Sequence, residues 1–192
     1  MADISFDPSQ AALVVIDLQN GVASLPATPH AGSDVVSRTA QLADALRAKG
    51  GTIVWVNVMA PAGPLALMPD LDNPPNFPPS FPAQWSELVP DLSVQSEDVR
   101  VFKRNWGAFY GTDLDLQLRR RGIRTIVLTG IATNLGVEST ARDAYERGYN
   151  QIFVEDAMSG LGENAHASAI GTTFPRIGRV RSTADVLAFL GA

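Results

Sequence analysis

Three features of the chain could do chemistry, and each follows a short apolar run. Asp17 and Lys103 each close such a run, and Gly136 comes a few residues after a third. A carboxylate desolvated by apolar neighbours can act as an acid or a base, and a lysine beside it would stabilise negative charge. Backbone N–H groups at a helix start near Gly136 would suit an anion. Structural alternatives stay open here: a turn residue at Asp17, a solvated charge at Lys103 and close packing at Gly136.

Strands and helices alternate along the chain, and they must position these residues. Runs of apolar residues predict strands, whereas apolar residues at helical spacing predict helices. Ser33 is a candidate N-cap of the first long helix, and Gly50 is a candidate stop signal. The predicted strands are residues 11–18, 52–59, 99–104, 125–130, 151–155 and 177–180, and the predicted helices are residues 33–49, 113–121, 136–147, 163–173 and 183–190.

This alternation predicts an α/β fold, a mostly parallel sheet with helices on both faces. At 192 residues the chain is expected to form a single domain spanning residues 1–192. Ligands of such sheets bind beyond the carboxyl ends of the strands. Asp17, Lys103 and the segment leading to Gly136 all lie at such ends, so we expect one site there.

Composition and charge exclude several classes of function. The net charge of −5 argues against nucleic acid or an anionic membrane as a partner. The absence of cysteine excludes disulfides, thiolate metal sites and a cysteine nucleophile. No apolar run reaches the length of a membrane span, and the first ten residues lack the basic region of a signal peptide. We therefore expect a cytoplasmic protein that acts on a small molecule.

A proline-rich stretch between positions 61 and 90 interrupts the pattern. It cannot form a long regular element, and its Leu, Phe and Trp residues make it too apolar for a solvated linker. We expect an ordered loop insertion, residues 60–97, that packs on the body, forms a lid or meets a partner subunit through Phe77, Phe81 and Trp85. Because large apolar patches are rarely left on a monomer, we also expect a homo-oligomer, a dimer or tetramer.

The three features belong to longer motifs that together resemble the isochorismatase-like (cysteine hydrolase) superfamily. Its pattern is a strand ending D-x-Q, a lysine followed by x3-(S/G)-A-F-x2-T-x-L, and G-(I/V)-x-T-x-x-C-V-x-x-T-A-x-D-A. This chain has Asp17-Leu18-Gln19, then Lys103 with Gly107-Ala108-Phe109, Thr112 and Leu114, then GIATNLGV at 130–137 and TARDA at 140–144. The phrases WGAFYGTDL, LQLRRRGI and GVESTAR are similar to those of the YecD-like subgroup. The match runs in order along nearly the whole chain.

The resemblance implies a three-layer αβα fold, a six-stranded mostly parallel sheet and a site formed by Asp17, Lys103 and Gly136. It further implies a non-proline cis peptide, here Ile131–Ala132, that aims the backbone N–H groups of Ala132 and Gly136 at an oxyanion. The remaining candidates, for the substrate pocket, are Gln19, Trp106, Phe109, Thr133 and Asn134.

Gly136 is the departure that decides the chemistry, since the amidases of the superfamily carry their nucleophilic cysteine there. Glycine cannot form an acyl-enzyme, and neither Thr133 nor Ser139 has an evident histidine base in the sequence. True isochorismatases also carry glycine: their aspartate protonates a vinyl ether, and water attacks the resulting oxocarbenium carbon. The resemblance therefore favours a cofactor-independent hydrolase of a small anionic ether without a covalent intermediate. Arg104 and Arg142 are candidates to bind the substrate carboxylate, although a surface position is expected for each.

Two other interpretations stay open: an amidase in which Asp17 activates water directly, and an inactive homologue that binds a metabolite or partner. The substrate is also open, since true isochorismatases commonly read A-H-I-G where this chain reads TNLG at 133–136. Nicotinamidases of the superfamily hold a metal through an aspartate and histidines after the second strand, where this chain has Asn57 and Met59. Because His30 and His166 lie far apart in the sequence, we expect no metal and no cofactor.

Overall fold

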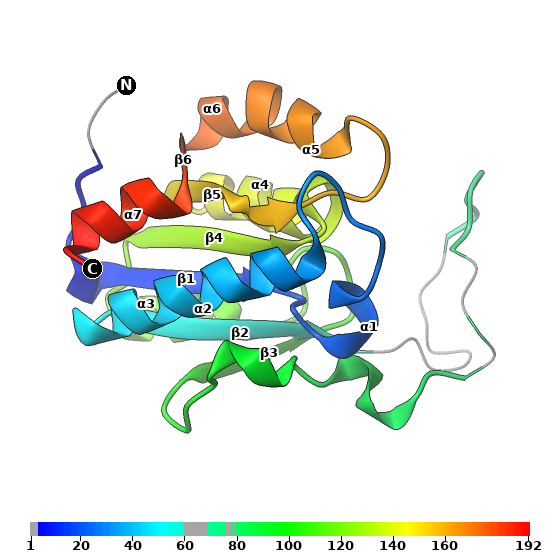
Figure 1. The fold of residues 1–192 in the computed structure, drawn as a ribbon, viewed down its shortest axis with the longest axis horizontal. Coiled ribbons are helices and arrows are strands. Elements are labelled where there is room, and N and C mark those ends of the chain that lie inside the picture. Colours follow the sequence, from blue (N-terminus) through cyan, green and yellow to red (C-terminus); the bar gives the residue numbers. More distant parts are fainter. Residues whose placement is uncertain (1–3, 60–68, 76–77, 79) are drawn as a thin grey trace.

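The structure, a computed structural model, describes residues 4–59, 69–75, 78 and 80–192, and a six-stranded sheet lies at its centre (Figure 1). The strand order is β3-β2-β1-β4-β5-β6, and every neighbouring pair is parallel. The predicted α/β fold is confirmed. The strands are β1 (Ala11–Ile16), β2 (Thr52–Val58), β3 (Val99–Lys103), β4 (Thr125–Ile131), β5 (Asn150–Ser159) and β6 (Arg179–Arg181).

Helices cover both faces of this sheet (Figure 1). They are α1 (Asn20–Ala23), α2 (Gly32–Ala48), α3 (Leu114–Arg120), α4 (Glu138–Glu146), α5 (Ala165–Ser168), α6 (Phe174–Ile177) and α7 (Thr183–Leu190). The odd-numbered residues of β1 pack with α2 and α7, and the even-numbered ones pack with α3, α4 and α6. This burial on both faces explains the unbroken apolar run of β1. None of the helices in the described part of the chain has the length and hydropathy of a membrane span.

Several predicted boundaries are corrected by the structure. The first long helix has Ala31 as its N-cap residue, so the predicted cap at Ser33 is wrong, whereas Gly50 follows the helix with a φ of +79° as predicted. β5 continues to residue 159, four residues past its predicted end at 155. The single helix predicted over 163–173 is instead α5 followed by a π-helical turn, Ala169–Thr173, that leads into α6.

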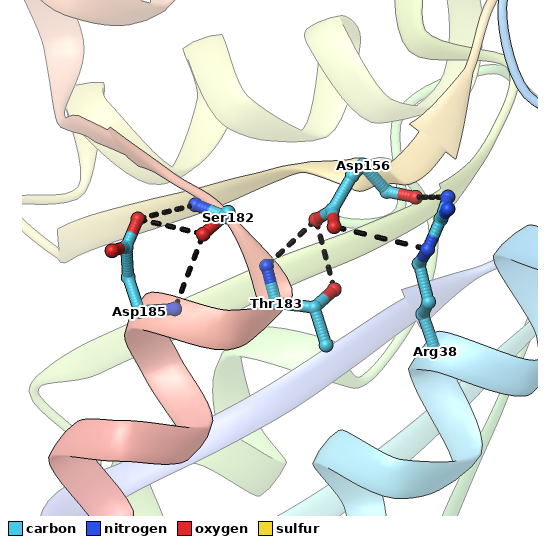
Figure 2. A network of polar contacts seen from close by, with 5 residues as sticks. All are labelled: Arg38, Asp156, Ser182, Thr183 and Asp185. Atoms are coloured by element: carbon cyan, nitrogen blue, oxygen red, sulfur yellow. Dashed lines mark hydrogen bonds and ion pairs between the residues drawn. The ribbon is translucent and has the colours of Figure 1, made fainter.

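A polar network fixes the last helix to the sheet (Figure 2). Asp156 Oδ1 in β5 accepts hydrogen bonds from the backbone N–H and the hydroxyl of Thr183, at 2.7 and 2.8 Å. Arg38 of α2 donates to the backbone carbonyl of Asp156 at 2.6 Å. Ser182 and Asp185 form a reciprocal capping box at the first turn of α7. These bonds hold α7 beside α2 on one face of the sheet.

The described part of the proline-rich insertion has an exposed portion and a packed one. Residues 69–75 are exposed, whereas the rings of Phe81 and Trp85 lie 4.8 Å apart. Trp85 also covers Gly21, where a Cβ would lie 2.0 Å from the indole nitrogen. Trp85 therefore packs on the body, which is one of the three arrangements predicted. Phe77 lies outside the described residues.

Candidate active site

The candidate site lies at the carboxyl edge of the sheet, next to the point where the strand order reverses between β1 and β4. Asp17 directly follows β1, and Lys103 is the last residue of β3. Lys103 Nζ lies 2.7 Å from Asp17 Oδ2, and the two side chains are only 2% and 7% exposed. Lys103 Nζ also donates to the backbone carbonyl of Asn105 at 3.1 Å. The structure thus brings these two predicted residues together as a buried ion pair.

Asp17 differs from an ordinary turn residue in conformation and environment. Its φ of +54° lies in the left-handed region, which costs a non-glycine residue about 1–2 kcal/mol and recurs at functional sites. Its Oδ1 atom is buried without a hydrogen-bond partner among the described residues. Burial raises the pKa of Asp17 to about 6, although the charge and hydrogen bond of Lys103 oppose this shift. Such a carboxyl group can exchange protons near neutral pH.

Gly136 lies directly against this ion pair. It belongs to a π-helical turn, Thr133–Val137, that connects β4 to α4. A Cβ at position 136 would lie 3.3 Å from Asp17 Oδ2, 3.3 Å from the backbone oxygen of Trp106 and 3.0 Å from Ile16 Cγ2. The three residues implied by the superfamily motifs are therefore neighbours in space.

The strand that leads to Gly136 ends in an unusual backbone. Gly130 has a φ of +121°, and a Cβ there would lie 2.1 Å from a carbonyl oxygen of β1, so only glycine permits this close approach. The Ile131–Ala132 peptide is cis, as the resemblance implied. The Ala132 carbonyl then accepts hydrogen bonds from two N–H groups of the turn, at 3.1 and 3.2 Å. These contacts hold the turn beside the end of β1.

Gln19 supports the end of β1. Its Nε2 donates to the backbone carbonyls of Val58 and Trp85 at 3.0 and 3.2 Å. Its Oε1 accepts from the Val58 N–H at 2.8 Å, and the residue is fully buried. The amide therefore joins β1 to β2 and to the proline-rich insertion, and its polar atoms are occupied by backbone groups.

Trp106 and Phe109, both predicted for the pocket, lie in different surroundings. Trp106 is 63% exposed, and its backbone is next to Gly136. Phe109 is buried in the core layer of α3 and α4, with its ring 6.0 Å from that of Tyr149 and 4.8 Å from the Arg147 guanidinium. Phe109 thus packs in the core, and its predicted place in the substrate pocket stays a prediction.

Thr133 and Asn134 bind the segment that follows β5. The Thr133 hydroxyl lies 2.9 Å from His166 Nδ1, so the prediction that it lacks a histidine partner is wrong. Asn134 donates to the Leu161 carbonyl at 3.1 Å and accepts from the Leu161 N–H at 3.0 Å. The rings of His30 and His166 lie 5.9 Å apart, edge to face, although they are distant in the sequence. Sequence reasoning missed this group because no local pattern links its members.

The remaining candidates are exposed or form no cluster. Arg142 pairs with Glu138 at 2.7 Å on the outside of α4, and Arg104 is exposed. Within the described ranges, no three His, Cys, Asp or Glu side chains gather as metal ligands would.

Comparison with known proteins identifies the family. The sequence model of the Isochorismatase domain matches residues 11–185, so the chain belongs to the isochorismatase family. Over 188 residues it is 48% identical to the uncharacterized isochorismatase family protein YwoC of Bacillus subtilis (strain 168), with 97% of each chain covered. Over 176 residues it is 45% identical to the uncharacterized family protein YecD of Escherichia coli O157:H7, covering 92% of this chain and 94% of YecD.

An amidase and a solved structure are also similar to the chain. The ureidoacrylate amidohydrolase RutB of Methylobacterium radiotolerans is 35% identical over 213 residues, which cover 98% of this chain and 81% of RutB. The structure of an isochorismatase family protein from Burkholderia thailandensis is 50% identical and superposes with a TM-score of 0.93 over 100% of both chains.

Proposed function

We propose that the protein is a hydrolase of small anionic metabolites in which Asp17 transfers protons and water attacks the substrate directly. The observation that carries this proposal is the buried Asp17 Oδ1, which lacks a hydrogen-bond partner in the described part of the chain and lies in a carboxyl group beside Gly136. A pKa of about 6 leaves Asp17 partly protonated near neutral pH. Since the chain has no cysteine and glycine has no nucleophilic side chain, covalent catalysis by residue 136 is excluded.

The favoured reaction is hydrolysis of an enol ether. Protonated Asp17 gives its proton to the terminal carbon of the C=C bond, which leaves an oxocarbenium ion and a carboxylate. Water adds to the cationic carbon and returns a proton to Asp17. The resulting hemiketal breaks its C–O bond and releases an alcohol and a ketone, so one water is consumed and Asp17 is regenerated.

The neighbouring residues would assist these steps. Lys103, 2.7 Å from Asp17, favours the carboxylate formed in the first step. The backbone N–H groups of Ala132 and Gly136 would bind negative charge on the substrate. Trp106, whose backbone lies beside Gly136, would contact the substrate, and Gln19 would position the strand end. This chemistry requires neither a metal nor a cofactor.

An amidase is the second candidate, favoured by the similarity to RutB, which is named as an amidohydrolase. Here the Asp17 carboxylate would take a proton from the attacking water, and the same N–H groups would stabilise the tetrahedral oxyanion. The two reactions differ in pH dependence. The ether reaction needs protonated Asp17, so kcat/KM falls as the pH rises through about 6, whereas the amidase reaction needs the carboxylate and rises there.

A panel of enol ethers, amides, ureides and esters tests the proposal on wild type, Asp17→Ala and Asp44→Ala. Asp44 is the control because its side chain is a 62% exposed carboxylate on α2. We expect an enol ether to be hydrolysed by wild type and Asp44→Ala but not by Asp17→Ala. Amide turnover that rises with pH would select the second candidate. Turnover retained by Asp17→Ala would overturn both, and no turnover across the panel would favour an inactive binding protein.

We also propose that the protein forms a homo-oligomer, a dimer or tetramer. The support is two exposed aromatic side chains, one in β3 and one in the segment after it, namely Phe102 and Tyr110, which are 51% and 65% exposed. Such side chains are commonly covered by a partner. Light scattering that shows only a monomer at micromolar concentration would contradict the proposal.

A further inference from the structure

Two side chains of the turn that carries Gly136 are held by the segment that follows β5. The Thr133 hydroxyl lies 2.9 Å from His166 Nδ1, and Asn134 makes two hydrogen bonds to the Leu161 backbone at 3.1 and 3.0 Å. We call Thr133, Asn134, Leu161 and His166 the clamp. It connects the turn after β4 to the loop after β5 and to α5.

A second set of contacts holds His166 in place. The His30 ring meets the His166 ring edge to face at 5.9 Å, and the His30 N–H donates to Ser159 Oγ at 3.1 Å. Thr28 and Gly160 exchange backbone hydrogen bonds of 3.0 and 2.7 Å. A Cβ at Gly160 would lie 2.9 Å from the His166 backbone nitrogen. His166 therefore has little freedom to move away from the turn.

The contact between Thr133 and His166 is buried, at 0% and 9% exposure. Burial, with a smaller effect of His30, lowers the pKa of His166 to about 4, so the ring is neutral near neutral pH. A neutral imidazole has one donor and one acceptor nitrogen, which matches the single hydroxyl of Thr133. Removing that hydroxyl would leave Nδ1 buried without a partner, which is unfavourable. The burial of Thr133 favours a supporting role over a nucleophilic one.

The turn transmits the position of Thr133 to the site. Thr133 directly follows Ala132 and precedes Gly136 by three residues within one π-helical turn. A Cβ at Gly136 would lie only 3.0–3.3 Å from its neighbours, so the turn packs closely against Asp17. The far side of the turn is also fixed, because the Thr140 hydroxyl donates to the Gly136 carbonyl at 2.7 Å. A shift at Thr133 would therefore move both Ala132 and Gly136.

We propose that His166 is a positioning residue, which acts through the Thr133 hydroxyl to hold Ala132 and Gly136 against Asp17. The proposal rests on the proposed function, which makes this turn part of the site. His166 itself touches no reacting group. Its effect is on the placement of the turn and hence on the reactivity of any group at position 136.

A thiol reporter tests the proposal without a substrate. The chain has no cysteine, so Gly136→Cys introduces a single thiol next to Asp17 and Lys103. The rate constant for alkylation by iodoacetamide, measured against pH, gives the thiol pKa and its accessibility. In this background we compare Thr133→Val, Thr133→Ser, His166→Leu and His166→Asn. Thr39→Val is the matched control, because Thr39 is a fully buried threonine of α2 whose hydroxyl has no partner in the described structure.

Thr133→Val and His166→Leu should change the alkylation rate at least about fivefold and shift the thiol pKa, because the turn loses its support. Thr133→Ser retains the hydroxyl, and His166→Asn offers an amide near the Nδ1 position, so both should stay within about twofold of the parent. Thr39→Val should have no effect. A Thr133→Val profile identical to that of the parent would overturn the proposal.

Amide hydrogen exchange of residues 131–138 provides the second measurement, in chains that retain Gly136. Exchange should be faster in Thr133→Val than in wild type and unchanged in Thr39→Val. If Thr133→Val does not fold, His166→Gln replaces it in this measurement, since the glutamine amide cannot take the Nδ1 position. Exchange of residues 131–138 in His166→Gln that equals that of wild type would overturn the proposal. The alkylation and exchange measurements can support the role of His166 even if the substrate panel shows no hydrolysis. Hydrolysis can likewise occur if His166 has no such role, so failure of this proposal and failure of the proposed function are distinguishable.

Discussion

Two carboxylates beside strands of the same sheet have very different surroundings. Asp156 in β5 accepts two hydrogen bonds from Thr183 through Oδ1, and its Oδ2 lies 3.8 Å from Arg38 Nε (Figure 2). Asp17 at the end of β1 has Lys103 on Oδ2, and its Oδ1 is buried with no partner in the described residues. Asp156 fixes a helix, whereas Asp17 keeps one buried oxygen atom without a hydrogen bond.

Asp98 shows that depth of burial is not what separates the two cases. Its side chain is only 3% exposed, which is more buried than that of Asp17. Its Oδ2 nevertheless accepts hydrogen bonds from Arg47, Trp55 and Gln95, at 3.0, 2.7 and 2.9 Å. A buried carboxylate that serves stability is surrounded by donors. Asp17 has Lys103 on Oδ2 and no hydrogen-bond partner on Oδ1 within the described residues, and this difference supports the proposal that Asp17 serves chemistry.

The largest expected effect is that of Asp17→Asn on turnover. The substitution keeps the shape of the side chain and removes its proton chemistry, so kcat should fall about 10³-fold or more. The free energy of unfolding should fall by less than about 3 kcal/mol, because the 2% exposed Lys103 loses its counter-charge while the cost of a buried carboxylate disappears. Urea denaturation of wild type and Asp17→Asn measures the change in the free energy of unfolding. Retained turnover in Asp17→Asn would show that Asp17 is not the acid.

Asp98→Ala should produce the opposite outcome. The substitution leaves the Trp55 and Gln95 N–H groups and the Arg47 guanidinium without their shared acceptor. The free energy of unfolding should therefore fall by about 3–5 kcal/mol, while kcat per folded molecule stays within about twofold. A loss of kcat without a loss of stability would remove the distinction between Asp98 and Asp17.

Asp156→Ala should have the smallest effect of the three. Thr183 loses an acceptor at the start of α7, but the side chains of Asp156 and Arg38 are 27% and 33% exposed, so water can replace part of the interaction. We expect a loss of about 1–2 kcal/mol, seen as a decrease in Tm of about 2–6 °C by calorimetry. A change above about 4 kcal/mol would mean that α7 depends on Asp156 far more than these contacts indicate.

The sequence predicted the sheet well because strands buried on both faces are continuous apolar runs. β1, β2 and β4 begin where they were predicted, at residues 11, 52 and 125. The end of β5 was missed because residues 155 and 156 are charged, which interrupts the apolar run. Pairing with β4 resumes beyond them, after a register shift, at Met158 and Ser159. A charged residue can remain in a strand when partners such as Thr183 bind it.

For the candidate site, the sequence predicted the residues that lie at strand ends. Asp17, Lys103 and Gly136 are neighbours as expected, because parallel strands bring their carboxyl ends to one edge. The sequence could not show that Thr133 contacts His166, since that contact depends on how the loop after β5 folds back. Nor could the sequence show the surroundings of Phe109. Its motif position suggested a pocket, whereas its ring packs in the core.

Direct titration of Asp17 tests the central claim most closely. The claim is that a buried, underpartnered carboxyl group beside Lys103 exchanges protons near neutral pH. Its folded pKa of about 6 exceeds the ordinary value of 3.8, so its ionisation should also reduce stability as the pH rises between these values. Carbon-13 NMR of the aspartate side chains should show one carboxyl carbon titrating near pH 6 that is absent in Asp17→Asn and titrates higher in Lys103→Met, where the neighbouring charge is gone. An Asp17 carboxyl that titrates at or below about pH 4, or that ignores Lys103→Met, would contradict the account.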